Sequence, residues 1–284
     1  MSVILVTGAT GNAGRQVVRH LLDQGVAVRG LARDPGRAAD GGPAGALQVV
    51  AGDLARAESL AGALGGVETV FLVWPFLTTE GAPAVLDLLK RHVRRVVYLS
   101  SSGVRDGARR QTDPINQLHA DMEALIEGSR LEWTVLRSNT IATNALGWAE
   151  QIRTTGVVRG PDIAATAVIH EGDIGAVAAR VLTSPGHEGA RHVLTGPEVV
   201  SRAEQVQAIG DAIGRVLRFE PVALDVARER MLADGRPPAL VEALLASAES
   251  RPESRLVTTT VEHLTGTPPR PFTTWAHDNA HAFR

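Results

Sequence analysis

The sequence predicts an α/β fold in which helices cover both faces of a parallel sheet, a doubly wound arrangement. A short β-branched run at residues 3–7 leads directly into Gly8-Ala-Thr-Gly-Asn-Ala-Gly14, and helical spacing of apolar residues follows at 15–22. Strand-like and helix-like runs then alternate through the first half of the chain. A strand, a glycine-rich turn and a helix in this order predict a Rossmann-type fold, here with a smaller C-terminal region.

Six apolar runs in the first half have the length and composition of buried strands. Amphipathic stretches with helical spacing lie between some of them, at 82–93 and 116–126. This order predicts parallel strands joined by helical crossovers, with ligands at the carboxyl ends of the strands. The predicted strands are residues 3–7, 27–32, 47–51, 70–74, 95–100 and 132–137.

The second half of the chain is less regular. Ser201-Arg-Ala-Glu204 is a capping-box pattern, which predicts a helix that ends at Gly214. Helical stretches on either side of Asp234-Gly-Arg-Pro-Pro238 predict a helical hairpin. The other predicted elements are short strands at 154–158 and 167–170, a helix at 173–182, a strand at 191–194 that returns to the sheet, and a last helix after 268–271.

Composition excludes several classes of function. The net charge of −2 over 284 residues gives no electrostatic case for a nucleic-acid partner. The chain has no Cys, which excludes disulfides and thiolate sites and fits a reducing compartment. No apolar run approaches the roughly 20 residues of a membrane span, and no signal peptide precedes the first strand. We therefore expect a cytoplasmic protein without a membrane partner, as a monomer or homodimer. His277 and His281 are four apart but lack a third ligand, so no metal site is predicted.

The glycine turn predicts a dinucleotide cofactor. Glycines let the backbone approach a pyrophosphate, and the N-terminus of the following helix offers unpaired N–H groups to it. We therefore expect Gly8, Thr10, Gly11, Asn12 and Ala13 to bind the cofactor. On this basis residues 1–145 form the nucleotide-binding domain and 146–284 mainly the substrate-binding region, with 173–197 returning to the sheet and 223–250 as a possible helical lid.

The end of the second strand favours NADPH over NADH. No carboxylate that could bind a ribose diol stands there, and Arg33 occupies the place where a 2′-phosphate is expected. The alternative is a solvated surface arginine beside a turn. Asp53 and Leu54, after the third strand, are predicted to meet the adenine, although Asp53 is nearly as well suited to cap the next helix.

Several motifs together resemble the atypical short-chain dehydrogenase/reductases of the NmrA-like branch, over nearly the whole chain. This resemblance implies an NAD(P)H-dependent reductase of quinones, triarylmethane dyes or polyketide ketones, or a redox-sensing regulator that binds NADP without turnover. The motifs are Thr7-Gly-Ala-Thr-Gly-Asn-Ala-Gly14, Ala32-Arg-Asp-Pro35, Gly52-Asp-Leu54, Tyr98-Leu-Ser-Ser-Ser102, His119-Ala-Asp-Met-Glu123, Leu136-Arg137, Glu171-Gly-Asp-Ile174 and Leu194-Thr-Gly-Pro197.

The chain departs from the superfamily at its acid pair, in which a Lys four residues after a Tyr lowers the pKa of that Tyr. Tyr98 and Lys90 are the only Tyr and Lys, and they stand in the wrong order. Alignment through the motif that ends at Glu123 puts Ile115 at the Tyr position and His119 at the Lys position. The resemblance therefore argues against sugar epimerases and standard ketoreductases.

Three residues remain as candidates for the chemistry. Ser101 and Ser102 follow the fifth strand, so either hydroxyl can hydrogen-bond a carbonyl oxygen, or alternatively pack or contact the nicotinamide ribose. His119 can relay a proton because imidazole titrates near neutrality, or it can bind ribose or lie on the helix surface. A phenol of the substrate is a further possible proton donor. The residues expected near the cofactor at the strand ends are Val73, Trp74, Ser100, Arg137 and Asn139.

The sequence thus predicts an NADPH-dependent reductase that transfers hydride to a ketone or quinone carbonyl of an aromatic, possibly polyketide, molecule. A place in antibiotic biosynthesis would fit such a substrate. The main alternative is an NADP(H)-sensing regulator without turnover. Reduction of carbon–carbon or imine bonds is a third possibility.

Overall fold

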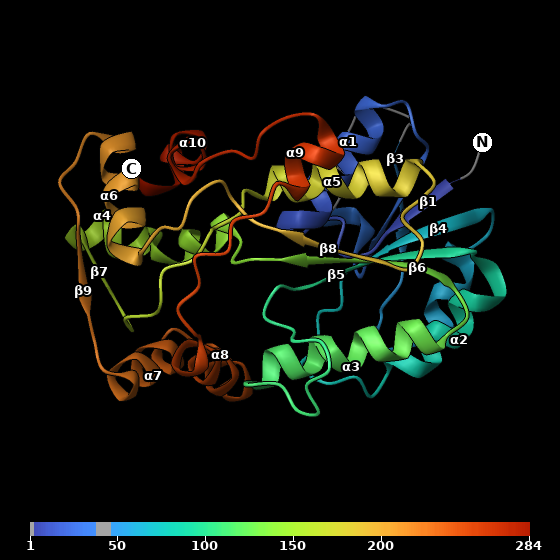
Figure 1. Cartoon of the computed structure of the whole chain (residues 1–284), viewed down its shortest axis with the longest axis horizontal. Helices are drawn as coiled ribbons and strands as arrows, with labels where there is room; N and C mark the ends of the chain where they lie inside the picture. The colour runs from blue at the N-terminus through green and yellow to red at the C-terminus, as the bar shows by residue number, and fades with distance from the viewer. Residues whose placement is uncertain (1–2, 38–46) are drawn as a thin grey trace.

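The computed structural model describes residues 3–37 and 47–284. Seven parallel strands form its central sheet in the order β3-β2-β1-β4-β5-β6-β8 (Figure 1). The order reverses between β1 and β4, which creates a crevice at their carboxyl ends. The strands are β1 (Val3–Val6), β2 (Val28–Ala32), β3 (Leu47–Ala51), β4 (Val67–Leu72), β5 (Arg95–Ser101), β6 (Glu132–Ser138) and β8 (Ala190–Leu194).

Helices cover both faces of this sheet, as the doubly wound prediction requires (Figure 1). The first face carries α1 (Asn12–Asp23), α5 (Glu171–Thr183) and α9 (Thr260–Thr265). The second carries α2 (Ala82–His92) and α3 (Pro114–Gly128). The 3-10 helix η1 (Pro35–Arg37) follows β2, and η2 (Ala57–Ala63) stands between β3 and β4.

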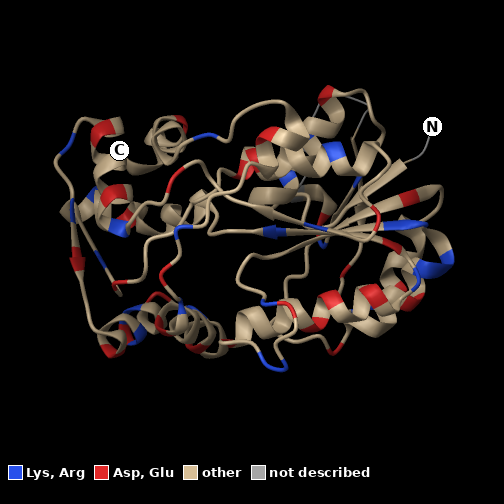
Figure 2. Ribbon diagram, in the orientation of Figure 1, with Lys and Arg blue, Asp and Glu red and all other residues tan. Residues whose placement is uncertain are grey.

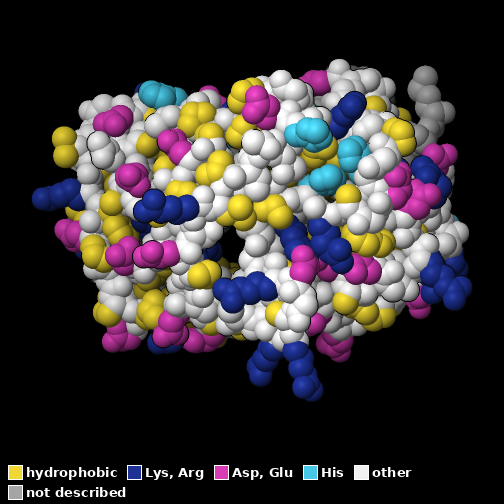
Figure 3. Space-filling model, viewed as in Figure 1, with side chains coloured by type: hydrophobic (Ala, Val, Ile, Leu, Met, Phe, Trp, Pro, Cys, Tyr) yellow, Lys and Arg dark blue, Asp and Glu magenta, His cyan; other side chains and the backbone are white. Residues whose placement is uncertain are grey.

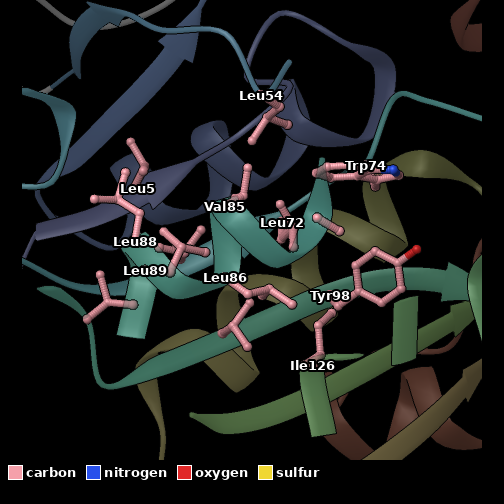
Figure 4. Close-up of a cluster of buried hydrophobic side chains, with 14 of the residues drawn as sticks. Leu5, Leu54, Leu72, Trp74, Val85, Leu86, Leu88, Leu89, Tyr98 and Ile126 are labelled. Carbon is pink, nitrogen blue, oxygen red and sulfur yellow. The ribbon is translucent and has the colours of Figure 1, made fainter. Parts of the chain in front are cut away.

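The alternation of side chains along the strands produces two cores, one on each face. In β5, Val97 packs with the residues of α1 and α5, whereas Val96 and Tyr98 pack with those of α2 and α3. Figure 4 shows Tyr98 and Trp74 at one end of this second cluster and Leu88 and Leu89 at the other. Tyr98 is fully buried, so the only tyrosine of the chain belongs to the core.

The remaining elements form a third core at the carboxyl end of the sheet. Trp275 and Phe283 are its largest fully buried side chains, and they pack with Ile152, Val206 and Ile209. Strands β7 and β9 pair in parallel beside this core. The elements are η3 (Ala142–Trp148), α4 (Ala149–Thr155), β7 (Val157–Gly160), α6 (Arg202–Ile213), β9 (Arg218–Pro221), α10 (Phe272–Asp278) and η4 (Ala280–Phe283).

Helices α7 (Leu224–Ala233) and α8 (Pro238–Ser250) form the predicted helical hairpin. Its apolar side chains make a fourth, small cluster in which Ala227, Val241 and Leu245 are buried. The hairpin lies below the third core, and α8 contacts α3 (Figure 1). It therefore bridges the C-terminal region and the second face of the sheet.

Two predictions in the second half were wrong. Residues 154–158 are not one strand, because α4 continues to Thr155 and Gly156, at φ 67°, ends the helix before β7 begins. Residues 167–170 form no strand, since only single bridges join Ile141 to Ile169 and Thr166 to Val200. Strand β9 was not predicted, because its partner β7 lies far away in the sequence. The capping box at Ser201 and the left-handed end at Gly214 are both confirmed.

Charged residues lie mainly on helices and loops, and few are on the central strands (Figure 2). Basic and acidic side chains are interspersed on the face shown in Figure 3. Among residues 3–37 and 47–284, no helix combines the length and apolar character needed to cross a membrane.

Candidate active site

The glycine turn between β1 and α1 leaves backbone groups open at the carboxyl edge of the sheet. Gly8 adopts φ +61°, which favours glycine, and its carbonyl accepts a 2.8 Å hydrogen bond from the Gly11 N–H. A Cβ on Gly14 would lie 2.1 Å from the Gly8 carbonyl oxygen, so a larger residue would displace the turn. Thr10, Gly11 and Asn12 are exposed, whereas Ala13 is buried.

The N-terminus of α1 fits an anionic group. Its cap residue, Gly11, provides no side-chain hydrogen bond, and its first turn contains no acidic residue. The first N–H groups of a helix carry partial positive charge and attract phosphate. That these residues hold a pyrophosphate stays a prediction.

Thr7, just before the glycine turn, holds the end of β1 against the segment after β4. Its Oγ1 accepts a 2.7 Å hydrogen bond from the Val73 N–H and donates a 3.2 Å bond to the Val73 carbonyl. These two bonds join the segments after β1 and β4 at the point where the strand order reverses. Val73 is half-buried there. A Cβ added to Gly8 would lie 3.4 Å from the Cβ of Val73.

Arg33 and Asp53 lie after β2 and β3, on one side of this crevice. Arg33 is exposed, and the neighbouring Asp34 carboxylate accepts a 3.1 Å hydrogen bond from the Gly36 N–H. Asp53 Oδ1 accepts a 3.0 Å hydrogen bond from the Ala55 N–H, and this bond forms an Asx turn. Asp53 does not cap η2, because the N-cap residue of that helix is Arg56. Leu54 is buried in the core. Among residues 3–37 and 47–284, no hydrogen bond or ion pair engages the Arg33 side chain.

Trp74 faces the core of the second sheet face. Its Nε1–H donates a 2.8 Å hydrogen bond to the Thr78 carbonyl, and its ring meets the edge of Phe76 at 5.0 Å between centroids. A groove of about 440 Å³ opens beside this loop, between Leu77 and the start of α3.

Ser100 and Arg137 both bind Glu123, a residue that we had not predicted to take part in the site. Ser100 Oγ donates a 2.5 Å hydrogen bond to Glu123 Oε1, and Arg137 Nη2 lies 2.6 Å from Glu123 Oε2. Arg137 also forms a two-pronged ion pair with Asp106, at 2.7 and 3.1 Å. Burial opposes the charge of the Arg137 guanidinium, but its bonds to the two carboxylates outweigh burial and raise its pKa. This buried network accounts for Ser100 and Arg137 without a ligand.

The two candidate serines differ in their surroundings. Ser101 Oγ donates a 2.8 Å hydrogen bond to Asn116 Oδ1 and accepts a 3.1 Å bond from the Gly103 N–H. Ser102 is half-buried, and its backbone N–H donates to the Ser138 carbonyl at 2.9 Å. Within the described residues, only Ser102 of this pair has a hydroxyl without a hydrogen-bond partner.

His119 does not titrate near neutrality, which corrects the reason for which it was predicted. Burial lowers its pKa to about 4. Its Nδ1 lies 2.8 Å from the hydroxyl of Tyr98, whose pKa is raised by burial and by the charge of Glu123. Tyr98 therefore stays protonated and donates to Nδ1, which leaves the His119 proton on Nε2. At neutral pH His119 is a hydrogen-bond donor and not a cation.

Asn139 and the hairpin border the space beyond β6. Asn139 Oδ1 accepts hydrogen bonds from Thr166 Oγ1 and from the Thr140 N–H. Figure 3 shows the surface hollowed in the region between the carboxyl ends of β5 and β6 and the α7–α8 hairpin. His277 and His281 are both exposed, and among the described residues no three His, Asp or Glu side chains gather as metal ligands.

Residues 8–185 match the protein-family model described as NAD(P)H-binding. The chain belongs to this family. It is an oxidoreductase of the atypical short-chain dehydrogenase/reductase type and belongs to the NmrA-like branch, as the motifs indicated.

Two curated relatives span the full length of this NAD(P)H-binding protein. A (4-alkanoyl-5-oxo-2,5-dihydrofuran-3-yl)methyl phosphate reductase of Streptomyces griseus is 38% identical over 285 residues, covering 99% of both chains. An NAD(P)H azoreductase of Xenophilus azovorans is 32% identical over 287 residues, again covering 99% of both.

Solved structures share the fold. An NADPH-dependent quinone oxidoreductase of Escherichia coli, in complex with NADPH, has a TM-score of 0.80 at 22% identity and covers 99% of this chain and 100% of its own. A triphenylmethane reductase of Citrobacter in complex with NADP(H) has a TM-score of 0.79 at 22% identity, with the same coverage.

Four polar residues of this NAD(P)H-binding protein escaped prediction as site residues. Asp106 lies in the β5–α3 connection and Asn116 in the first turn of α3. Arg202 and Arg251 come from distant helices. Arg251 Nη1 donates a 2.7 Å hydrogen bond to Thr140 Oγ1 across 111 positions of sequence. No local pattern in the sequence indicates such a contact.

Proposed function

We propose that this protein is an NADPH-dependent reductase that transfers hydride to a ketone or quinone carbonyl of an aromatic small molecule. The observation that carries the proposal is the exposed Arg33 at the tip of β2, next to an uncapped α1 N-terminus. Reductases of quinones, azo compounds and triphenylmethane dyes among the similar proteins support a conjugated acceptor.

The proposed cofactor site extends along the carboxyl edge of the sheet. Backbone groups of Gly8, Thr10, Gly11, Asn12 and Ala13 hold the pyrophosphate, and Arg33 binds the 2′-phosphate. Asp53 and Leu54 border the adenine. Val73, Trp74 and Asn139 border the nicotinamide side, while Ser100 and Arg137 shape it through Glu123.

The bound nicotinamide supplies the hydride, and the protein has to orient the acceptor and stabilise the developing oxyanion. Ser102 provides a hydroxyl for that oxygen, and the Nε2–H of neutral His119 is a second donor. Ser101 positions Asn116 and the loop around it. Tyr98 cannot act as the usual acid because it is fully buried, and Lys90 pairs with Asp87 on the outer face of α2. Proton delivery therefore falls to Ser102, His119, water or a phenol of the substrate.

The C-terminal half supplies the acceptor side in this proposal. Residues 1–145 bind the nucleotide and 146–284 mainly the acceptor, with 223–250 acting as a lid over the hollow of Figure 3. The hairpin has its own apolar cluster and rests on α3, so it can move as a unit.

The test is oxidation of NADPH and of NADH against a panel of polycyclic aromatic ketones and quinones, with and without a phenol beside the carbonyl. We expect turnover that is faster with NADPH and with the phenolic acceptors. Tight NADPH binding without turnover of any acceptor would instead support the sensor alternative. Preference for NADH would remove the role proposed for Arg33.

A further inference from the structure

Arg202 and Arg251 lie in the C-terminal region and differ from the other inward-facing arginines. Arg95 pairs with Glu188, and Arg137 pairs with Glu123 and Asp106. Arg202 and Arg251 are half-buried, yet within the described residues neither forms an ion pair with a carboxylate. Each donates only to a neutral oxygen, Arg202 to the Pro161 carbonyl at 2.6 Å and Arg251 to Thr140 Oγ1 at 2.7 Å.

The nearby acidic groups act on these arginines only at a distance. Asp113 is the acidic group that acts on Arg251, but its two oxygens already accept bonds from Ile115, Asn116 and Thr112 at the start of α3. Asp162 is the acidic group that acts on Arg202, and it is exposed to solvent. Within the described residues neither carboxylate forms an ion pair with its arginine, so N–H donors of both guanidinium groups remain available to a ligand.

The charge of Arg251 also reaches the guanidinium of Arg202. Burial, and to a smaller extent the positive charge of Arg251, lower the pKa of Arg202 to about 10. Burial likewise lowers the pKa of Arg251. Both remain protonated at neutral pH, so two half-buried cations repel each other here. An anion between them would relieve that repulsion.

Their positions face the proposed reaction site. Thr140 comes two residues after the end of β6, at the edge of the sheet that carries Ser102 and Asn139. Arg202 opens α6 and Arg251 caps the end of α8, so the two come from opposite sides of the C-terminal region. Figure 3 shows Lys or Arg side chains at the margin of the hollow.

We propose that Arg202 and Arg251 bind a phosphate monoester carried by the substrate, distal to the group that is reduced. A phosphate monoester carries about −1.5 to −2 charges at pH 7, which balances two guanidinium groups better than a carboxylate does. Arginine also matches phosphate geometry through paired N–H donors. The inference rests on the proposed reductase function and adds the substrate class, an aromatic or conjugated carbonyl compound with a phosphate ester arm.

The first test measures binding without turnover. Phenyl phosphate, benzoate and phenol are titrated by calorimetry into the protein saturated with NADP, so that the cofactor site is already filled. We expect phenyl phosphate to bind tightest, benzoate more weakly and phenol not at all. Replacing either arginine, R202Q or R251Q, should weaken phenyl phosphate by about 10- to 100-fold.

Arg159→Gln is the matched control. Arg159 is also half-buried and lies in the same region, but Glu220 already pairs with it at 2.8 Å. The R159Q variant should bind phenyl phosphate within about twofold of wild type, because the removed charge was neutralised. Equal effects of R159Q and R251Q, or equal binding of phenyl phosphate and phenol, would overturn the proposal.

The second test uses wild type alone, so it does not depend on the folding of a variant. A naphthoquinone with a hydroxymethyl arm is compared with its phosphate ester as acceptor. We expect a KM at least about tenfold lower for the ester. Turnover of both with equal KM refutes the phosphate site and leaves the reductase intact. Phosphate binding without turnover of either refutes the proposed function and leaves the site intact.

Discussion

The glycine turn after β1 and the polar cluster after β5 lie at the same edge of the sheet, but they are built in opposite ways. The turn, from Gly8 to Gly14, offers backbone groups that no side chain of the described residues caps. In the cluster, Arg137 binds the carboxylates of Glu123 and Asp106, and Ser101 binds Asn116. Backbone N–H groups at an exposed turn can be left to water until a ligand arrives, whereas buried charges have to be paired within the protein.

The difference implies that substitutions in the cluster act first on stability and substitutions in the turn first on ligand binding. Four variants or conditions test this division, and they are ordered by expected size.

Glu123→Ala should have the largest effect, because it leaves Arg137 buried without its closest carboxylate. We expect a loss of about 3–5 kcal/mol in the free energy of unfolding, measured with denaturant. The control is Glu242→Ala, which breaks the exposed pair with Arg228 and should cost far less. Similar losses for both variants would mean that burial does not distinguish the two pairs.

His119 should make the protein less stable in acid. Its pKa is about 4 in the folded protein and about 6.5 when unfolded, so the unfolded chain binds more protons between these values. Its contribution is complete above pH 6.5 and is lost as the pH falls towards 4, by up to about 3 kcal/mol. His119→Gln should flatten the pH dependence of the unfolding free energy over this range. An unchanged slope would show that other groups, such as the buried His170, produce it.

Gly14→Ala should distort the turn, since its Cβ would lie 2.1 Å from the Gly8 carbonyl oxygen. We expect a stability loss of about 1–3 kcal/mol together with weaker NADPH binding, measured by unfolding and by fluorescence titration. Gly62→Ala is the control, because a Cβ there meets no atom within 4 Å. If both variants bind NADPH as wild type does, the turn is not the pyrophosphate site.

Arg33→Ala should have the smallest effect and leave stability unchanged. We expect NADPH affinity to fall about tenfold, equivalent to about 1.4 kcal/mol, while NADH affinity stays the same. Arg19→Ala, an exposed arginine on α1, serves as the control. Equal losses of NADPH and NADH affinity would show that Arg33 does not bind the 2′-phosphate.

Features that depend only on neighbouring residues, like the glycine turn, could be predicted from the sequence. All six strands of the first half were confirmed, with ends displaced by at most three residues, because each is a contiguous apolar run. The glycine turn was predictable for the same reason, since its geometry depends on neighbouring residues. β9 was missed because pairing with β7, and not its own composition, makes it a strand.

Side-chain networks depend on the folded chain and could not be predicted from local patterns. Arg137 was expected to face the cofactor because it ends a strand, but only the fold shows that Glu123 of α3 lies within 2.6 Å. His119 was expected to titrate near neutrality because its burial against Tyr98 is not visible in the sequence. Thr140 and Arg251 meet only after the whole C-terminal region is in place.

The hairpin of α7 and α8 has its own apolar cluster, centred on Ala227, Val241 and Leu245 and separate from the three larger cores. A change in one of its side chains therefore requires no repacking around the sheet. Over evolutionary time this segment can accumulate substitutions and, as the proposed lid, admit new acceptors, while the glycine turn stays as it is. The fold thereby separates the part of the chain that can diversify from the part that cannot.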